Sequence, residues 1–150
     1  MRRLHGAVAR TGWSSAMNSG VRVGRRETFS AAHQLCDPAL SAEQNRERFG
    51  QCASVHGHNY TLEVVVGGAI NAHGYVCDLR ALKQVIHERI IADVDHRDLN
   101  HAVPWLAGLV PTTEVLAQAF WRRLVDHIPE GRLELVRVYE TKKNFAECRG

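Results

Sequence analysis

Hydrophobic and polar side chains alternate most regularly over residues 58–66. One face of this stretch carries His58, Tyr60, Leu62, Val64 and Val66, and the other carries polar residues. A period of two indicates a half-buried β-strand, and this one begins at a His-Gly-His sequence and ends at Gly67-Gly68. A second strand is predicted over residues 21–33, where Phe29, Ala31 and His33 share a face.

Two further strands are predicted at the C-terminal end. Residues 133–141 are apolar on both faces, with Leu133, Leu135 and Tyr139 on one and Val136 and Val138 on the other. Residues 145–148 then pair back through a turn at residues 142–144. A strand that is apolar on both faces needs cover on both, so we expect oligomerisation.

The central part of the chain changes to a helical period. Asp78 is a suitable N-cap for a helix over residues 79–94, and a second helix is predicted from Thr112 or Thr113 to about His127. A short exposed helix is expected at residues 41–48. The order strand, strand, helix, helix, strand, strand predicts an α+β fold, a four-stranded antiparallel sheet with two helices on one face.

The composition is that of a globular domain. Of 150 residues, 45% are hydrophobic and 23% charged, and no apolar run is long enough to span a membrane. We expect one domain over residues 21–150, preceded by a disordered extension over residues 1–20, with Met17 as an alternative start. The three arginines of that acid-free extension account for the whole net charge of +3, so no nucleic-acid partner is indicated. The four cysteines form no CxxC pair, which favours reduced thiols and a cytoplasmic location.

The histidines at the ends of the first two strands are candidate metal ligands. His56 and His58 stand at i and i+2 of a strand and point to one side, and His33 ends the neighbouring strand. Three neutral imidazoles leave an open fourth position on zinc, as in catalytic zinc sites. The alternative is a structural role, because an isolated His-x-His pair is a weak signal.

Three other features are candidates for chemistry, each with a structural alternative. Cys52 lies four residues before His56, where a nearby cation favours the thiolate, although most free cysteines are small buried residues. Asp95 and His96 form a pair in which the carboxylate can fix the tautomer, although it can also cap the preceding helix. Glu140 interrupts an apolar strand and can accept two N–H donors from a guanidine-like edge, although most strand carboxylates face solvent.

These features occur in an order that resembles one known family. The resemblance covers nearly all of residues 21–150. It rests on Phe29-Ser-Ala-Ala-His33, Phe49-Gly-Gln-Cys52, His56-Gly-His58-Asn-Tyr60, Asp78-Leu-Arg-Ala-Leu-Lys83, Asp95-His96-Arg-Asp-Leu99, Pro111-Thr-Thr-Glu114 and Tyr139-Glu140-Thr141. Together they resemble the 6-pyruvoyl tetrahydropterin synthase and 6-carboxytetrahydropterin synthase (QueD) family.

The resemblance implies a role for each position. It implies that His33, His56 and His58 hold Zn²⁺ and that Cys52, Asp95 and His96 transfer protons. Glu140 would anchor a pterin, and Thr112, Thr113 and Glu114 would line its pocket. It also implies the tunnelling fold (T-fold), in which subunits join their sheets into a β-barrel, usually a hexamer of two trimers with active sites between subunits.

The implied substrate is 7,8-dihydroneopterin triphosphate, and two products are open. The short spacing from Cys52 to His56, together with Asp78, favours the 6-carboxytetrahydropterin of queuosine biosynthesis. Phe49-Gly50, His-Gly-His-Asn-Tyr and Tyr139-Glu-Thr favour 6-pyruvoyl tetrahydropterin. A non-catalytic zinc- or pterin-binding protein and a related cyclohydrolase or aldolase are further alternatives. Lys142, Lys143 and Arg97 are candidates for the triphosphate.

Overall fold

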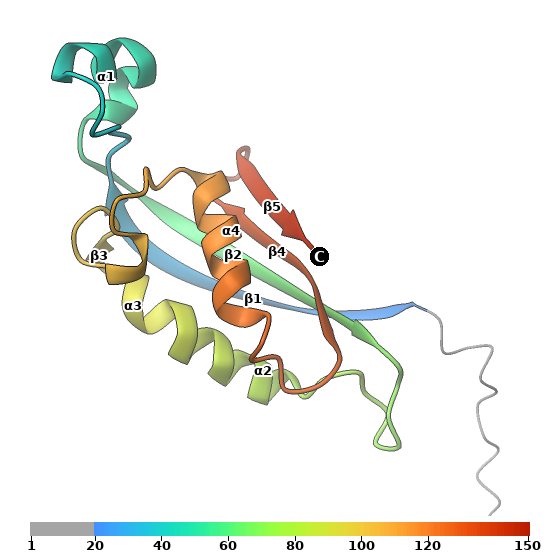
Figure 1. The fold of residues 1–150 in the computed structure, drawn as a ribbon. Helices are drawn as coiled ribbons and strands as arrows, with labels where there is room; N and C mark the ends of the chain where they lie inside the picture. Colours follow the sequence, from blue (N-terminus) through green and yellow to red (C-terminus); the bar gives the residue numbers. More distant parts are fainter. Residues whose placement is uncertain (1–19) are drawn as a thin grey trace, which may run out of the picture.

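The computed structural model describes residues 20–150, and within that range the strands form one five-stranded sheet of order β3-β1-β2-β4-β5 (Figure 1). The four long strands are antiparallel neighbours and form the predicted sheet: β1 (Val21–His33), β2 (His56–Gly68), β4 (Arg132–Tyr139) and β5 (Phe145–Arg149). The expectation of four strands is corrected by one short addition, β3 (Arg97–Asp98), which lies parallel to β1. The extension predicted over residues 1–20 lies outside the described residues apart from Gly20.

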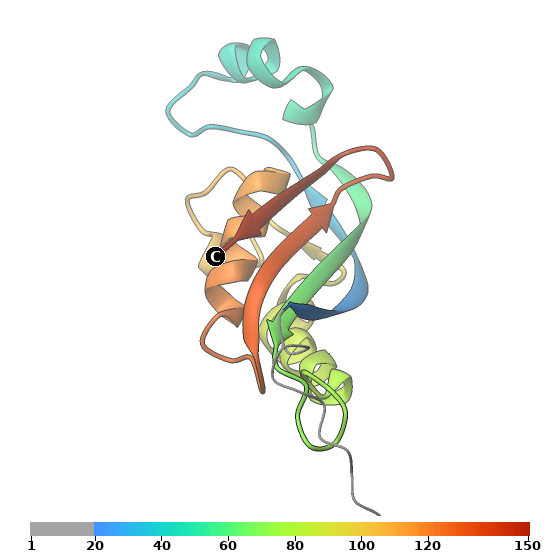
Figure 2. The same cartoon turned by 90° about the vertical axis from the view of Figure 1, so that its right-hand side faces the viewer.

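The helices lie along one face of the sheet (Figures 1 and 2). α2 (Leu79–Ile86), η3 (His87–Ile91) and α3 (Ala92–Val94) follow one another without a break and pack on β1. α4 (Thr113–Leu124) packs on β4 and β5, and η4 (Pro104–Leu106) precedes it. The caps are as predicted: the Asp78 carboxylate accepts from two backbone amides of α2, and the Thr112 hydroxyl accepts from Val115 N.

The first helical segment contains a π-helical turn that its sequence period did not predict. In η3 the backbone N–H of Ala92 bonds to the carbonyl of His87, five residues earlier. This wider helical turn directs the consecutive side chains of Ile90 and Ile91 toward the core. Both are buried, at 0% and 5% exposed. Burial of both isoleucines therefore accounts for the local departure from the α-helix.

The core lies between the sheet and these helices. Tyr60, Leu62, Val64 and Val66 are fully buried on the face of β2 that the alternation predicted. They meet Leu82 and Ile86 of α2 and Leu116, Phe120 and Leu124 of α4, all of them also 0% exposed. Each such side chain contributes about 1.5–3 kcal/mol of transfer free energy, which fixes the helices against the sheet.

A β-bulge corrects the predicted faces of β4. Val66 pairs with Leu133 and Val65 pairs with Leu135, so Glu134 is the extra residue between them. Because the bulge shifts the alternation by one residue, Leu133 faces the helices with Val136 and Val138. The predicted face was therefore wrong for Leu133, whereas Leu135 and Tyr139 lie opposite Val136 and Val138 as predicted. The face of Leu135 and Tyr139 also carries Arg137, so it is only partly apolar.

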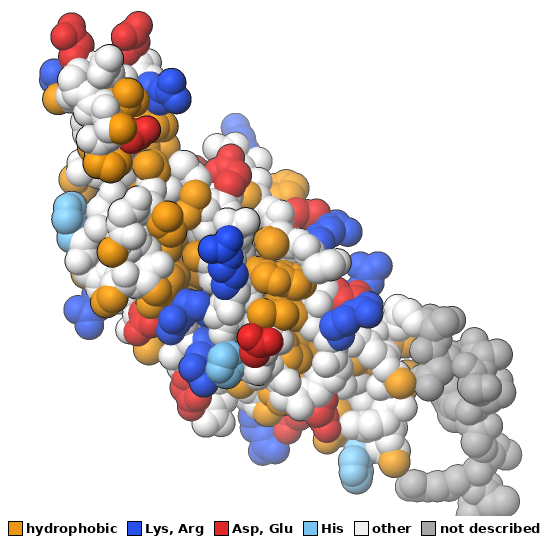
Figure 3. Space-filling model, in the orientation of Figure 1, with side chains coloured by type: hydrophobic (Ala, Val, Ile, Leu, Met, Phe, Trp, Pro, Cys, Tyr) orange, Lys and Arg blue, Asp and Glu red, His pale blue; other side chains and the backbone are white. Residues whose placement is uncertain are grey.

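The face of the sheet opposite the helices also carries a row of ion pairs. Glu63 of β2 accepts from Arg26 of β1 at 2.6 Å and from Arg137 of β4 at 3.1 Å. Glu147 of β5 accepts from Arg137 at 2.6 Å and from Arg149 at 2.7 Å. The face that carries α2 and α4 also has charges of both signs scattered among apolar side chains (Figure 3). Among the described helices, none is long and apolar enough to cross a membrane.

The segment between β1 and β2 projects beyond the ends of these strands (Figure 1). It contains α1 (Ala42–Phe49), which is the predicted short helix and starts at a capping box on Ser41, followed by the turn η2 (Gly50–Ala53). Asn45 is 4% exposed and bonds to the backbone of Asp37 and Leu40, which closes the loop before α1. This closed segment places Cys52 shortly before the start of β2.

Candidate metal centre and active site

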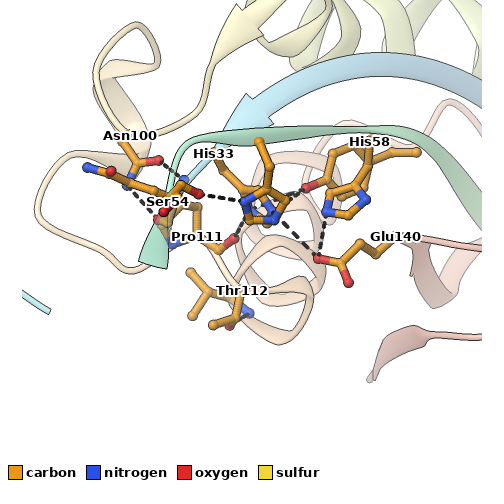
Figure 4. Close-up of polar contacts among 11 residues, drawn as sticks. His33, Ser54, His58, Asn100, Pro111, Thr112 and Glu140 are labelled. Carbon is orange, nitrogen blue, oxygen red and sulfur yellow. Dashed lines mark hydrogen bonds and ion pairs between the residues drawn. The ribbon is translucent and has the colours of Figure 1, made fainter. Parts of the chain in front are cut away.

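Three histidines meet where β1 ends and β2 begins. His33 is paired across the strands with His56, and Ala31 with His58, so all three imidazoles lie on the helix-covered side of the sheet. One ring nitrogen from each lies within 4.8 Å of the others, and the Nε2 atoms of His33 and His56 are 3.1 Å apart. Figure 4 shows His33 and His58 beside Glu140. The strand register thus brings together the three predicted metal ligands.

Backbone carbonyls fix which nitrogen of two rings is free. His33 Nδ1 lies 2.8 Å from the carbonyl of Pro111 (Figure 4), and His56 Nδ1 lies 2.7 Å from the carbonyl of Ser54. A carbonyl only accepts, so each Nδ1 carries the hydrogen and each Nε2 presents a lone pair to the other. Neither carbonyl was identified from the sequence: Pro111 is 78 positions from His33, and the contact of Ser54 with His56, two residues away, depends on the local backbone conformation.

The third ring has a buried nitrogen without a hydrogen-bond partner. His58 Nε2 is the one buried side-chain nitrogen or oxygen of the described residues that has no hydrogen-bond partner. An unpaired buried polar atom normally costs about 1–3 kcal/mol. Three converging ring nitrogens, two of them presenting lone pairs and the third without a hydrogen bond, are what a zinc ion with three histidine ligands requires, so these residues fit the metal.

Burial also favours the neutral form of His33 and His58, and neutral imidazole is the form that binds a metal. Desolvation lowers the pKa of His33, which is 1% exposed, and the nearby imidazoles lower it further. Desolvation likewise lowers the pKa of His58. Beneath the rings, the Tyr60 hydroxyl lies 3.3 Å from His33, and burial raises the pKa of that phenol well above its usual value.

Glu140 follows β4 and completes the cluster. Its Oε1 lies 3.6 Å from the Nε2 of His33 and 3.6 Å from the Nε2 of His58, and its side chain is 21% exposed. The carboxylate therefore faces the histidines instead of bulk solvent, unlike most strand carboxylates. It is positioned to meet a cationic or N–H-donating group that approaches the metal site.

Cys52 lies in η2 and its residue is exposed. Its backbone carbonyl accepts from Leu35 N at 2.7 Å, which ties the turn to the chain just after His33. The alternative of a small buried residue is therefore wrong for Cys52, although it holds for Cys77, which is 2% exposed. All four cysteines lie in the described range and are free thiols.

Asp95 and His96 are attached to the outer edge of β1. One oxygen of Asp95 accepts from Ser30 N at 2.9 Å and lies 3.0 Å from His96 Nδ1, and His96 N donates to Ser30 O at 2.6 Å. The Ser30 amide is the main reason why the pKa of Asp95 is lowered. His96 has a positive φ of 57°, an uncommon backbone conformation for a non-glycine residue that often marks functional sites.

His96 borders a cavity of about 500 Å³ at this edge of the sheet. Ser30, Asn59 and Arg97 also line it, and so does His58 of the metal cluster. The side chains of Ser30 and Asn59 occupy the sheet face opposite the histidine rings. Among the described residues, no hydrogen bond or ion pair joins Asp95 or His96 to Cys52 or to the three histidines. One protomer thus carries the predicted residues as two separate groups.

The remaining predicted residues surround the metal cluster less closely. Thr112 caps α4 next to Pro111, while Thr113 and Glu114 form the first turn of that helix. Lys142 and Lys143 are exposed in the turn between β4 and β5, whereas Arg97 lines the cavity of His96.

Comparisons with known proteins agree with this geometry. A protein-family model described as 6-pyruvoyl tetrahydropterin synthase matches residues 22–150. The human 6-pyruvoyl tetrahydrobiopterin synthase is 42% identical over 132 residues, covering 86% of this chain and 91% of that protein. A putative 6-carboxy-5,6,7,8-tetrahydropterin synthase of Archaeoglobus fulgidus is 30% identical over 135 residues, covering 89% of this chain and 99% of its own.

A solved structure gives the same result. The 6-pyruvoyl tetrahydropterin synthase of Caenorhabditis elegans superposes with a TM-score of 0.81 at 34% identity, covering 87% of this chain and 95% of its own. The fold and the histidine cluster thus define a tunnelling-fold protein with a candidate metal centre. This chain belongs to the 6-pyruvoyl tetrahydropterin synthase family.

Proposed function

We propose that this protein is a zinc-dependent 6-pyruvoyl tetrahydropterin synthase, which eliminates triphosphate from 7,8-dihydroneopterin triphosphate. The observation that carries the proposal is the convergence of three histidine lone pairs beside Glu140 in a member of this family. The choice of product follows the relatives, since the human 6-pyruvoyl enzyme is more similar than the archaeal 6-carboxy enzyme.

The sequence had favoured the 6-carboxy product, which the comparisons support only at the level of the family. One of its two grounds has a structural explanation, because Asp78 is the N-cap of α2 and accepts from Arg80 N and Ala81 N. The short spacing between Cys52 and His56 is the remaining ground, and it keeps the 6-carboxy product as the second candidate.

The cluster divides the work among named residues. His33, His56 and His58 would hold the zinc. When bound, it would polarise substrate oxygens and lower the pKa of the hydroxyl groups on the side chain of the pterin substrate. Glu140 accepts two N–H donors from the pterin, with Thr112, Thr113 and Glu114 beside the ring. Cys52, on its exposed turn, removes a proton from the substrate side chain.

His96, oriented by Asp95, transfers protons at the other end of the substrate. Among the described residues, no hydrogen bond or ion pair joins this pair to Cys52 or to the histidines, and the side chain of Ser30, whose backbone holds the pair, faces the other side of the sheet. A complete site therefore takes His96 from a neighbouring copy. We therefore propose a homo-oligomer, a hexamer of two trimers, in which edge strands of neighbouring sheets meet and active sites form between subunits. Arg97 lines the cavity of His96 and is the best-placed candidate for the triphosphate.

Mass analysis of products tests the reaction. The zinc-loaded protein is incubated with 7,8-dihydroneopterin triphosphate, and released triphosphate and the pterin product are measured together. We expect triphosphate with 6-pyruvoyl tetrahydropterin. 6-Carboxytetrahydropterin would establish the second candidate, formate or glycolaldehyde would indicate a cyclohydrolase or aldolase, and pterin binding without triphosphate release would refute catalysis.

Mixing two inactive variants tests the shared site. Cys52→Ala and His96→Ala subunits are dissociated, mixed in equal amounts and reassembled, and each variant is reassembled alone as a control. If each site combines Cys52 and His96 from different copies, random mixing restores about one quarter of the wild-type activity. A mixture no more active than the separate variants would place both residues in one protomer.

A further inference from the structure

The side chain of Asn100 forms a two-point contact with the backbone just after His33. Its Oδ1 accepts from Gln34 N at 2.9 Å, and its Nδ2 donates to Gln34 O at 3.0 Å. The antiparallel pairing of β1 with β2 ends at His33 and His56, so Gln34 lies beyond the last paired residue. The Asn100 amide thus bonds to Gln34 as a peptide group of a neighbouring strand would.

This contact is the last of a series along the outer edge of β1. Ser30 O accepts from His96 N, and Ala32 O accepts from Leu99 N at 2.9 Å. Alternate residues of a strand direct their backbone groups to the same edge, so Ser30, Ala32 and Gln34 all bond to residues 95–100. Asn100 extends the short β3 pairing by one step with a side chain.

The series fixes the backbone on both sides of a metal ligand. Ala32 and Gln34 are held by Leu99 and Asn100, and His33 lies between them with its ring against Pro111 O. Asn100 is itself fixed, because its N–H donates to Asp98 Oδ1 at 2.9 Å. Figure 4 shows Asn100 at the strand end beside the histidine cluster.

We propose that Asn100 is a positioning residue, which holds the end of β1 so that His33 points its Nε2 at the metal and so preserves metal affinity. The inference rests on the metal site of the proposed function, but not on its substrate or product. Groups that orient metal ligands indirectly typically change affinity by about 10- to 100-fold when they are lost.

Zinc affinity and the Co²⁺ absorption spectrum test this role without an activity assay. Zinc dissociation constants are measured by competition with a chromophoric chelator, and the visible spectrum of the Co²⁺-loaded protein reports ligand geometry. We expect Asn100→Ala to weaken zinc binding about tenfold and to change the Co²⁺ spectrum. Asn100→Asp keeps the acceptor for Gln34 N but loses the donor, so its affinity should be intermediate.

Asn71→Ala is the matched control. Asn71 also uses its side-chain oxygen to accept backbone amides, those of His73 and Tyr75, but it lies in the loop between β2 and α2. We expect it to lower the melting temperature by an amount similar to the Asn100 variants and to leave both metal measurements unchanged.

The outcomes separate this inference from the proposed function. Wild-type zinc affinity and an unchanged Co²⁺ spectrum in Asn100→Ala would overturn the positioning role while leaving the metal site intact. The same result in Asn100→Asp would overturn it if Asn100→Ala did not fold. A wild-type protein that bound neither metal would overturn the metal site itself.

Discussion

Replacement of Glu140 by glutamine separates the two roles that its position allows. The carboxylate lies 3.6 Å from two ligand nitrogens, so it can anchor the pterin or bind the metal. We predict that Glu140→Gln leaves zinc bound and weakens the binding of substrate.

The magnitude follows from the hydrogen bonds that change. A carboxylate accepts two charge-assisted bonds from a guanidine-like edge, together about 4 kcal/mol, and the side chain is shielded enough for little screening. The glutamine oxygen accepts one neutral hydrogen bond from the pterin, of about 1 kcal/mol. Its amide group is itself a donor, so it cannot accept from the second N–H group of the pterin. The loss of about 3 kcal/mol corresponds to roughly a hundredfold higher KM.

The assay measures zinc content, KM and kcat for Glu140→Gln beside Glu130→Gln. Glu130 is exposed after α4, away from the cluster, and its replacement should leave all three values unchanged. A Glu140→Gln protein that lost zinc but kept the wild-type KM when reloaded would refute the anchoring role and make Glu140 a metal ligand.

Three further predictions concern the thiol, pH and the core. Cys52→Ala should keep zinc and lose turnover, and loss of zinc would show that Cys52 is a ligand instead. The folded-state pKa values of His33 and His58 are lowered below 6.5, so the unfolded chain binds more protons. The metal-free protein should therefore lose stability as pH falls below about 6.5, with a smaller loss in His58→Gln; a denaturation midpoint that does not fall would contradict this. Leu82→Ala removes a fully buried side chain and should cost about 2–5 kcal/mol in chemical denaturation, whereas Leu79→Ala, 37% exposed on the same helix, should cost much less; equal losses would contradict the burial argument.

The candidate site was predictable where its residues are close in sequence or share a strand pattern. The alternation over β2 places His56 and His58 on one side, and the end of β1 places His33 opposite His56. The position of Asp95 and His96 relative to the three histidines was not predictable in the same way. Asp95 and His96 lie on the outer edge of β1 because they bond to the backbone of Ser30, and Ser30 is 65 positions before Asp95 in the chain.

The sequence by itself determined the long strands, the caps of α2 and α4 and the three converging histidines, because alternation and capping depend on near neighbours in the chain. Tertiary structure alone decided the bulge at Glu134, the parallel strand β3 and the π turn, because each depends on contacts with an element that is distant in the chain. It also decided that His33 points Nε2 at the metal site. Its Nδ1 donates to the carbonyl of Pro111, which lies just before α4 and far from His33 in the chain.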